Sequence, residues 1–155
     1  ASGCSADGLI GEDHNPEPHL IPLILKAIKG ERDAITVFGT NYETPDGTCV
    51  RDYIHVEDLA DAHIKAFTYL LSGKGPVICN LGTGVGYSVK EMIEAAERAT
   101  GLKVPVKYRE GDPSYLVANP AKALAELGWK ASYTSIEDII ATAWKWENGE
   151  RKGRY

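Results

Sequence analysis

Residues 35–55 constrain the fold more than any other stretch, because they join a strand, a long polar loop and a second strand that leads into a helix. The β-branched and aromatic residues 35–38 predict the first strand. Asp46-Gly47 predicts a turn within the loop. The second apolar run carries Arg, Asp and Tyr at 51–53. Long loops held between rigid elements usually carry function, although a decorated β-hairpin is an alternative interpretation of the same pattern.

The composition is that of a globular domain. The chain has 155 residues, of which 43% are hydrophobic and 25% charged, so it can bury a real core. A net charge of −5 and a pI near 5.4 argue against nucleic acid as a partner. Cys4, Cys49 and Cys79 are scattered and odd in number, which fits a reducing compartment without a disulfide framework or a Cys-x-x-Cys zinc site.

Neither a membrane span nor a signal peptide is predicted. No apolar run approaches the roughly 20 residues that a spanning helix needs, and the first residues lack the charged and apolar regions of a signal peptide. We therefore expect a cytoplasmic protein that does not bind membranes. The only methionine is Met92, so we interpret the start of the chain as a cut into a longer protein.

The remaining segments alternate between helix and strand. Residues 1–18 predict a loop. Residues 77–81 form a continuous apolar run that predicts a parallel strand buried on both faces. Capping boxes at Ser88…Glu91 and Thr134…Glu137 predict helix starts, and Asn119 predicts another. The expected helices are 19–29, 56–71, 88–100, 119–128 and 134–146, and the further strands are 104–108 and 116–118.

The glycine-rich run Gly82-Thr-Gly-Val-Gly-Tyr87 is similar to a dinucleotide-binding loop but is not one. The pattern G-x-G-x-x-G requires glycine at position 87, where tyrosine stands. No acidic residue closes a second strand about 20 residues further on. We interpret the run as a turn that feeds a helix N-terminus, which can still attract phosphate.

Two further patterns were weighed. Asp52, His55, Asp58, Asp61 and His63 have the composition of a metal cluster. Their spacing favours a capped and packed helix instead, so we predict no metal there.

Arg51 and Arg109 each stand at a strand end beside an acidic and an aromatic residue. Two arginines at one cleft suit a diphosphate, because each guanidinium can bind phosphate oxygens bidentately.

The run from Gly39 to His63, which contains Thr-Pro-Asp-Gly-Thr followed by Val-Arg-Asp-Tyr-Ile-His-Val-Glu-Asp, closely resembles UDP-glucose 4-epimerases (UDP-galactose 4-epimerases). These enzymes belong to the extended short-chain dehydrogenase/reductase superfamily. The resemblance extends through the whole chain but covers only the C-terminal half of such an enzyme. The superfamily's catalytic Tyr-x-x-x-Lys pair is absent, because no tyrosine is followed by lysine four residues later. The resemblance therefore implies that the N-terminal NAD-binding domain, with that pair, is missing.

The resemblance also implies a set of substrate-binding residues and no catalytic or cofactor-binding residue. The arginines hold the UDP diphosphate, an acidic residue takes the ribose hydroxyls, and a strand backbone pairs with the uracil edge. His19 replaces the asparagine of many relatives, and the loop before Gly111-Asp112 is shorter than in most. The implied substrate-binding residues are His19, Leu20, Thr36, Val37, Phe38, Arg51, Tyr53, Val85, Arg109, Asp112 and Leu116.

The predicted fold is α/β, and residues 1–155 form the C-terminal UDP-sugar-binding part of an epimerase. A small mixed substrate-binding domain is expected from residues 1–53 and 101–155. Residues 54–100 would partly rejoin the cofactor domain, where a strand–helix segment completes a Rossmann-type parallel sheet. Without those neighbours, the segment 56–81 is expected to self-associate or to exchange its amide protons quickly.

The function implied by the resemblance is that of an isomerase in galactose metabolism. The whole enzyme inverts C4 of UDP-glucose or UDP-galactose through a 4-keto intermediate, with NAD as cofactor, and is expected to be a homodimer. The chain alone is expected to bind UDP or UDP-sugars, to bind NAD poorly and to be inactive. Two alternatives stay open: a non-catalytic UDP-sugar-binding or interaction module, and part of another nucleotide-sugar dehydratase or decarboxylase.

Overall fold

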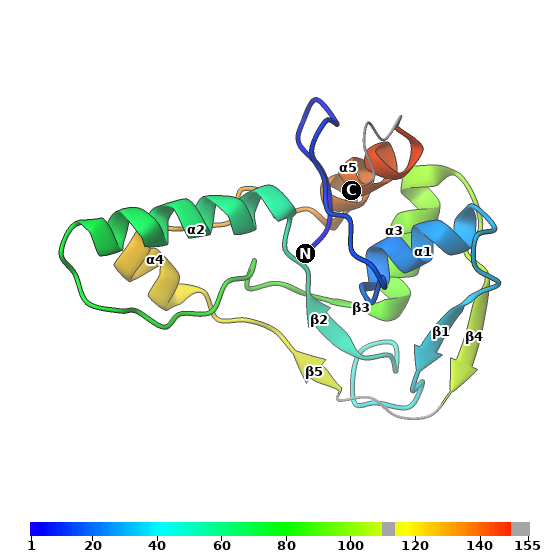
Figure 1. The fold of residues 1–155 in the computed structure, drawn as a ribbon. Coiled ribbons are helices and arrows are strands. Elements are labelled where there is room, and N and C mark those ends of the chain that lie inside the picture. The colour runs from blue at the N-terminus through cyan, green and yellow to red at the C-terminus, as the bar shows by residue number, and fades with distance from the viewer. Residues whose placement is uncertain (110–113, 150–155) are drawn as a thin grey trace.

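The computed structural model describes residues 1–109 and 114–149, which form five helices and five strands (Figure 1). The α/β fold class predicted from the sequence is confirmed. In chain order the described elements are α1 (Leu20–Ile28), β1 (Ile35–Phe38), β2 (Val50–Asp52), α2 (Val56–Leu71), β3 (Gly86–Ser88), α3 (Val89–Thr100), β4 (Val106–Arg109), β5 (Tyr115–Leu116), α4 (Ala121–Leu127) and α5 (Ile136–Asn148).

The strands form two small sheets. β1 pairs with β4 in parallel, and Ile35 lies opposite Val106. β2 is the middle strand of the other sheet, antiparallel to β3 and parallel to β5. The two strands that flank the polar loop 39–49 therefore belong to different sheets. The hairpin alternative is wrong, and the loop instead connects the two sheets.

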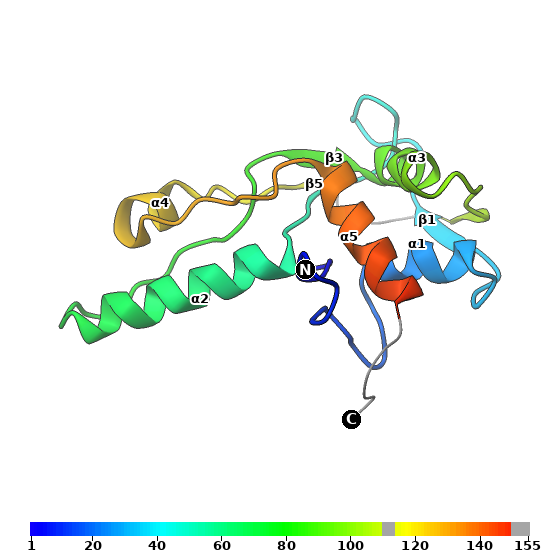
Figure 2. The same cartoon turned by 90° about the horizontal axis from the view of Figure 1, so that it is seen from above.

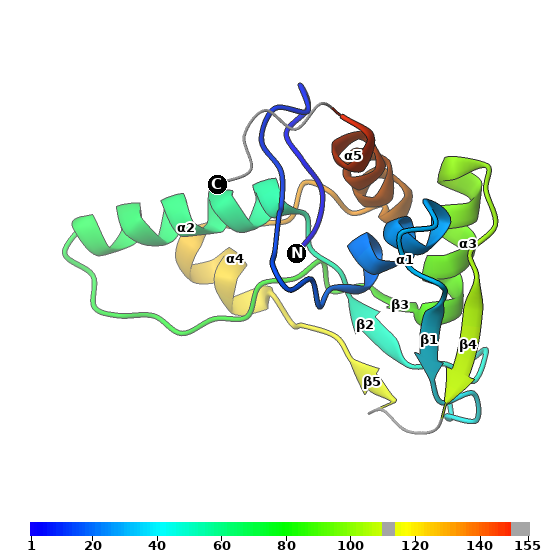
Figure 3. The same ribbon diagram turned by 45° about the vertical axis from the view of Figure 1, so that its right-hand side comes forward.

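The main core lies between α1, α3 and α5, which contact one another, and α1 also contacts β1 (Figure 3). Its central side chains are fully buried aliphatic residues, each of which stabilises the fold by roughly 1.5–3 kcal/mol through burial. Ser88 caps α3 in a capping box with Glu91, and Gly101 ends the helix in a left-handed conformation, as predicted. We call α1, α3, α5 and the two sheets the body. Its most deeply buried residues include Ile24, Leu25, Met92, Ile139 and Ile140.

A second, smaller core joins α2 to α4 and to the chain after it. Trp129 is fully buried there among small residues, and its indole Nε1 donates a hydrogen bond to the carbonyl of Asp58. We call α2, α4 and the connecting segment 72–82 the arm, which projects away from the body (Figures 1 and 2). The predicted division of the chain differs from this one: α3 packs into the body, whereas α4 packs against α2.

The predicted strand at 77–81 is wrong. The segment has no regular secondary structure, and the side chain of Ile78 is 87% exposed. No backbone–backbone hydrogen bond joins residues 74–82 to any other described residue. Apolar composition predicted burial, but a strand forms only where another strand pairs with it, and none of the described strands does so here.

Three smaller predictions also need correction. The last helix is capped by Ser135, whose side chain accepts a hydrogen bond from the N–H of Asp138, so the box does not begin at Thr134. The residue at the N-cap of α4 is Pro120, although Asn119 Oδ1 accepts from the N–H of Ala121. The strand expected at 104–108 is β4, and the one expected at 116–118 is the shorter β5. None of the described helices is long and apolar enough to cross a membrane.

The junction between arm and body is a buried polar cluster. His55 caps α2 by accepting the N–H of Glu57 on Nδ1, at 3.1 Å. Its Nε2 lies 3.0 Å from Thr142 Oγ1 on α5, and its ring stacks on Tyr133 at 3.6 Å. A side chain at Gly3 would collide with this ring, because its Cβ would lie 2.3 Å from Nε2. The first residues are therefore ordered against the start of α2.

Candidate functional site

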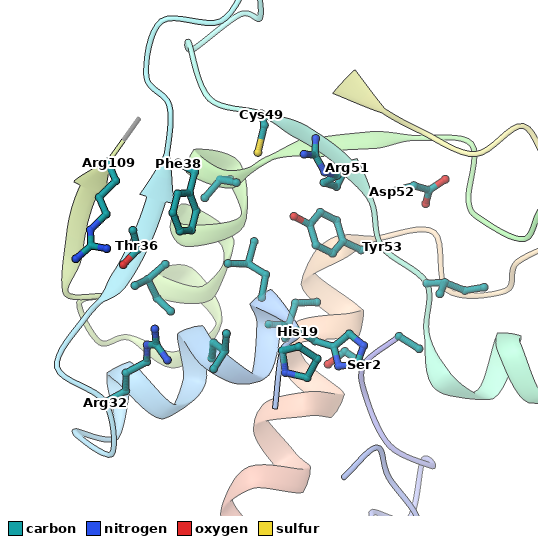
Figure 4. A pocket seen from close by; sticks show the side chains of 18 residues that line it. Ser2, His19, Arg32, Thr36, Phe38, Cys49, Arg51, Asp52, Tyr53 and Arg109 are labelled. Atoms are coloured by element: carbon teal, nitrogen blue, oxygen red, sulfur yellow. The ribbon is translucent and has the colours of Figure 1, made fainter. Parts of the chain in front are cut away.

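A cavity of about 690 Å³ opens in the body between β1, β2 and the N-terminal end of α1. This volume is typical of pockets for small molecules. Figure 4 shows that its walls come from separate parts of the chain: Thr36, Phe38 and Arg109 on one side, Arg51 and Tyr53 on the other, and His19 and Arg32 below. The predicted site residues that line it are His19, Leu20, Thr36, Phe38, Arg51, Tyr53 and Arg109.

One wall of the cavity offers unpaired backbone groups. Ile35 and Gly39 donate their N–H groups to carbonyls on the β4 side, at 2.8 and 2.7 Å. Successive residues of a strand direct their backbone groups to opposite edges. Thr36 and Phe38 therefore direct theirs to the edge of β1 that no described strand covers. That edge presents donors and acceptors beside an exposed aromatic ring, since Phe38 is 44% exposed.

Three arginines line the cavity from three different segments. Arg51 lies on β2 and donates from Nη1 to the carbonyl of Val50 at 2.8 Å. Arg109 ends β4, and Arg32 lies in the turn after α1, where its Nε donates to the carbonyl of Ala34 at 3.0 Å. Three guanidinium groups around one cavity make it a site for an anion with several oxygens.

Tyr53 brings both an apolar ring and a hydroxyl to the cavity. The ring packs against the main core, and Figure 4 shows the hydroxyl directed into the cavity. Burial raises the pKa of Tyr53 well above its ordinary value. The hydroxyl therefore stays protonated and serves as a hydrogen-bond donor rather than as a base.

The glycine-rich run 82–86 holds a protein carboxylate. Asp52 Oδ1 accepts from the N–H and the hydroxyl of Thr83 at 3.0 and 2.8 Å, and Oδ2 accepts from the N–H of Gly84 at 3.0 Å. A Cβ at Gly82 would lie 2.5 Å from Oδ2. The prediction of a turn rather than a dinucleotide loop agrees with this arrangement, because Asp52 occupies the N–H groups that an anion would otherwise use.

Four predicted site residues do not line the cavity or cannot be placed. Val37 lies in β1 but its side chain is buried in the core. Val85 is 47% exposed on the glycine-rich run. Leu116 lies opposite Arg51 in the β2–β5 pair and is exposed. Asp112 falls outside the described residues.

Sequence reasoning missed several lining residues. Arg32 follows the helix stop at Gly30 in the charged run Glu31-Arg-Asp33, a solvated pattern that gave no signal of a site. Its position just before the strand 35–38 is the one feature that could have indicated it. Cys49 directly precedes β2 and Asp52 is its last residue, whereas the N-terminal residues Ala1 and Ser2 reach the cavity only through tertiary packing.

The five Asp and His residues between 52 and 63 make separate contacts with different parts of the chain. Asp52 binds the glycine-rich run and His55 caps α2. Asp58 accepts from the N–H groups of Ser132 and Tyr133 at 2.8 and 2.9 Å. Asp61 pairs with Lys65 one helical turn away, and His63 Nδ1 lies 2.7 Å from the carbonyl of Leu59.

Comparison with known proteins finds similarity to UDP-glucose 4-epimerases. Residues 8–82 match the NAD dependent epimerase/dehydratase family. Over 155 residues the chain is 48% identical to the UDP-glucose 4-epimerase of Streptococcus mutans, covering 98% of this chain and 46% of that protein. The resemblance to UDP-glucose 4-epimerases found in the sequence is thus confirmed.

Solved structures agree with this result. The UDP-glucose 4-epimerase from Brucella ovis in complex with NAD matches with a TM-score of 0.88 and 48% identity, over 92% of this chain and 45% of that one. The enzyme from Bifidobacterium longum in complex with NAD⁺ and UDP matches with a TM-score of 0.84 and 41% identity, over 94% and 44%. The chain spans about half the length of the proteins it matches.

Proposed function

We propose that this chain is the UDP-sugar-binding half of a UDP-glucose/UDP-galactose 4-epimerase. The observation that carries the proposal is the cavity itself, which combines a free strand edge, an aromatic ring and three arginines. A pyrimidine base needs paired donors and acceptors, and a diphosphate needs cationic donors. The similar enzyme from Bifidobacterium longum, whose structure contains UDP, supports the same assignment.

The roles follow from where the side chains lie. The backbone of Thr36 and Phe38 pairs with the uracil edge, and Val37 holds that strand in the core. Arg51 and Arg109, with Arg32 as a further cation, hold the diphosphate. His19, Leu20 and Tyr53 line the other wall. From the family resemblance we assign the ribose hydroxyls to Asp112, contact with the nucleotide to Val85, and the limit on sugar size to Leu116.

The chain's part in the reaction is to hold the nucleotide while the sugar turns. In the whole enzyme, bound NAD supplies the hydride chemistry that oxidises C4 and reduces it again from the other face. The residues of this chain anchor the UDP moiety, and the free sugar can then present either face. The chain alone, without a Tyr-x-x-x-Lys pair, is proposed to be inactive and to bind NAD poorly.

Further proposals concern partners and location. UDP, UDP-glucose and UDP-galactose are the proposed ligands, and nucleic acids and membranes are not expected partners, given the net charge of −5. The whole enzyme is proposed to be a homodimer, and the chain alone to self-associate through its arm. No cysteine in the described part of the chain forms a disulfide, which is consistent with a reducing, cytoplasmic environment.

Titration calorimetry with UDP and with uridine tests the assignment. Arg51→Ala should weaken UDP binding by roughly ten- to a hundredfold, because a hydrogen bond to a charged group is worth about 1.5–3 kcal/mol. The same variant should leave uridine binding unchanged. Arg98→Ala is the matched control, since Arg98 pairs with Glu137 on the exposed side of α3. Unchanged UDP affinity in Arg51→Ala would refute the role of Arg51.

A second measurement separates the half-enzyme from a non-catalytic module. The chain alone is assayed with UDP-galactose and NAD, and then mixed with a separately produced NAD-binding half of a related epimerase. We expect no turnover without the second half and epimerase activity with it. Turnover by the purified chain alone, with host enzyme excluded, would contradict the half-enzyme assignment. UDP binding without any rescued turnover would favour the binding module.

A further inference from the structure

The loop that enters α1 gathers four metal-binding side chains outside the arginine-lined cavity. Their pattern is Glu12-x-His14-x-x-Glu17-x-His19. One carboxylate oxygen of Glu12 and one ring nitrogen of each histidine lie within 4.8 Å of one another. Of these side chains only His19 also lines the cavity. We call Glu12, His14 and His19 the Glu-His-His cluster.

The contacts within the cluster converge on a single carboxylate oxygen. Glu12 Oε1 lies 3.8 Å from Nδ1 of His14 and 3.7 Å from Nδ1 of His19. The two imidazole rings meet edge to face, with centroids 5.3 Å apart. Glu17 Oε1 lies 2.8 Å from the same Nδ1 of His19. One carboxylate and two imidazoles therefore face a common centre, and Glu17 lies beside His19.

Burial makes these carboxylates unusual for a surface loop. The side chain of Glu17 is 6% exposed and that of Glu12 is 14% exposed. Glu12 Oε2 is buried and has no hydrogen-bond partner among the described residues. A buried carboxylate with an unused acceptor favours a nearby cation.

We propose that Glu12, His14 and His19 bind a divalent transition-metal ion of the zinc type, with Glu17 as a neighbouring carboxylate that adds negative charge beside the ion. Two imidazole nitrogens and one carboxylate oxygen are ligands that Zn²⁺ prefers, with a further position left for water or substrate. A tetrahedral zinc ion separates its ligand atoms by about 3.3 Å. The separations of 3.7 and 3.8 Å that involve Glu12 need to contract only slightly to reach that value, and all three ligand atoms lie within 4.8 Å of one another.

Glu17 Oε1 contacts Nδ1 of His19, the same ring nitrogen that faces Glu12. Metal binding by that nitrogen would replace this hydrogen bond, and the charge of Glu17 would then attract the cation from close by. Because His19 also lines the cavity, a bound ion would join the loop 12–19 to the cavity wall. The metal site does not depend on the proposed nucleotide function, since its other ligands lie outside that cavity.

Another cation competes for the same carboxylates. Burial lowers the pKa of the α-amino group of Ala1, and the charges of Glu12 and Glu17 raise it, so this amine lies within their electrostatic reach. An uncharged N-terminus separates the two possibilities. Acetylation removes the amine as a competing cation and as a ligand while leaving the Glu-His-His cluster intact.

Calorimetric titration with Zn²⁺ and visible absorption of bound Co²⁺ test the proposal on the untagged chain. We expect one ion per chain, and visible absorption of the bound Co²⁺ as strong as that of a four-coordinate Co²⁺ site. Glu17→Gln should weaken Zn²⁺ binding by roughly tenfold, because it removes a negative charge close to the ion. His14→Ala should weaken it further, because it removes a ligand. His14 is half exposed, so this variant should fold normally, which circular dichroism verifies.

His63→Ala is the matched control, because His63 is an exposed histidine on α2 outside the cluster. It should bind Zn²⁺ like the original chain, and the acetylated chain should bind at least as tightly. Equal binding by His14→Ala and the original chain would overturn the proposal, as would a chain that binds no Zn²⁺. Loss of binding on acetylation alone would assign the ion to the amine and would also overturn it.

Discussion

The body and the arm have similar apolar sequences but bury them very differently. In the body, α3 buries Met92, Ala95 and Ala96 against α1 and α5. In the arm, α2 is longer, yet Asp58 and Ala62 are its only buried residues among those described. Four of its large apolar side chains are more than half exposed: Ile64, Phe67, Leu70 and Leu71. An apolar stripe thus defines a helix face, whereas burial depends on what packs against it.

The segment 77–81 also exposes apolar surface, since Ile78 is 87% exposed. Large exposed apolar surface is rare on a stable monomer. The chain spans about half the length of its relatives, so we propose that the arm packs against the other half in the whole protein. The four predictions below test this difference between the two regions.

The largest difference is expected in amide hydrogen exchange. Residues 74–82 should exchange at least about a thousandfold faster than α3, because protection in a folded core approaches the global free energy of unfolding. The chain should also self-associate, or exchange strands, through residues 56–81. Hydrogen exchange with mass spectrometry and light scattering measure the two effects.

Substitutions on the arm sharpen this prediction. Ile78→Lys should suppress self-association without lowering stability, and a complementary NAD-binding half should both suppress it and protect residues 74–82. A strictly monomeric chain whose residues 77–81 are as protected as α5 would show that the backbone amides of this segment find hydrogen-bond partners within the chain itself. It would also contradict the proposed packing of the arm.

Matched truncations give the next largest difference. Leu25→Ala removes a side chain that is fully buried in the body, and should lower the free energy of unfolding by about 2–5 kcal/mol. Phe67→Ala removes a larger side chain that is 63% exposed on the arm, and should change it by at most about 0.5 kcal/mol. Urea denaturation measures both. A larger loss for Phe67→Ala would mean that α2 is buried in solution.

The sequence predicted the elements whose signals are local. α2 has the predicted bounds, 56–71, because its start and its periodicity lie within the helix itself. The capping box of α3 and the glycine at its end were also sufficient to predict where this helix begins and ends. The segment 77–81 was predicted wrongly because a strand requires a partner, and a run of apolar residues does not reveal whether one is present. The pairing of β1 with β4 is likewise a property of tertiary structure.

The sequence predicted those residues of the candidate site that lie within a recognisable motif. The run around Arg51 and Tyr53 and the strand 35–38 indicated the two main walls of the cavity. Arg32 and the N-terminal residues reach it only through folding, so no spacing pattern could reveal them. The metal prediction considered residues 52–63 and cysteine pairs, and it passed over the spacing of Glu12, His14 and His19. Which role Asp112 plays remains a prediction.

A substitution at the junction tests how the arm is held to the body. Asp58 accepts two backbone N–H groups from residues 132 and 133, and Asn can accept only one of them. Asp58→Asn should therefore lower the free energy of unfolding by about 1.5–3 kcal/mol. Asp61→Asn is the control, because its pairing with Lys65 on the surface of α2 is worth at most about 0.5 kcal/mol. Equal effects of the two changes would show that Asp58 does not hold the junction.

The smallest expected effect is a pH dependence at the same junction. The Thr142 hydroxyl donates a hydrogen bond to the carbonyl of Ile139 at 2.9 Å, so its oxygen can accept a hydrogen bond from the Nε2–H of His55. Nδ1 already accepts the N–H of Glu57, so the neutral ring satisfies every contact. Burial lowers the pKa of His55, and the charges of Glu57 and Asp58 offset this only in part.

The sign of the effect follows from that shift. The unfolded histidine titrates near about 6.5, and the folded one below it, so the unfolded chain binds more protons in between. The contribution of His55 to stability is therefore complete above the unfolded pKa and is lost as the pH falls below it. His55→Asn keeps an acceptor at the helix N-cap but cannot titrate, so its free energy of unfolding should fall less than that of the original chain between neutral and mildly acidic pH. Denaturant titrations across that range measure the difference. Parallel curves for the two chains would mean that the junction is as open to water as the outer face of the arm.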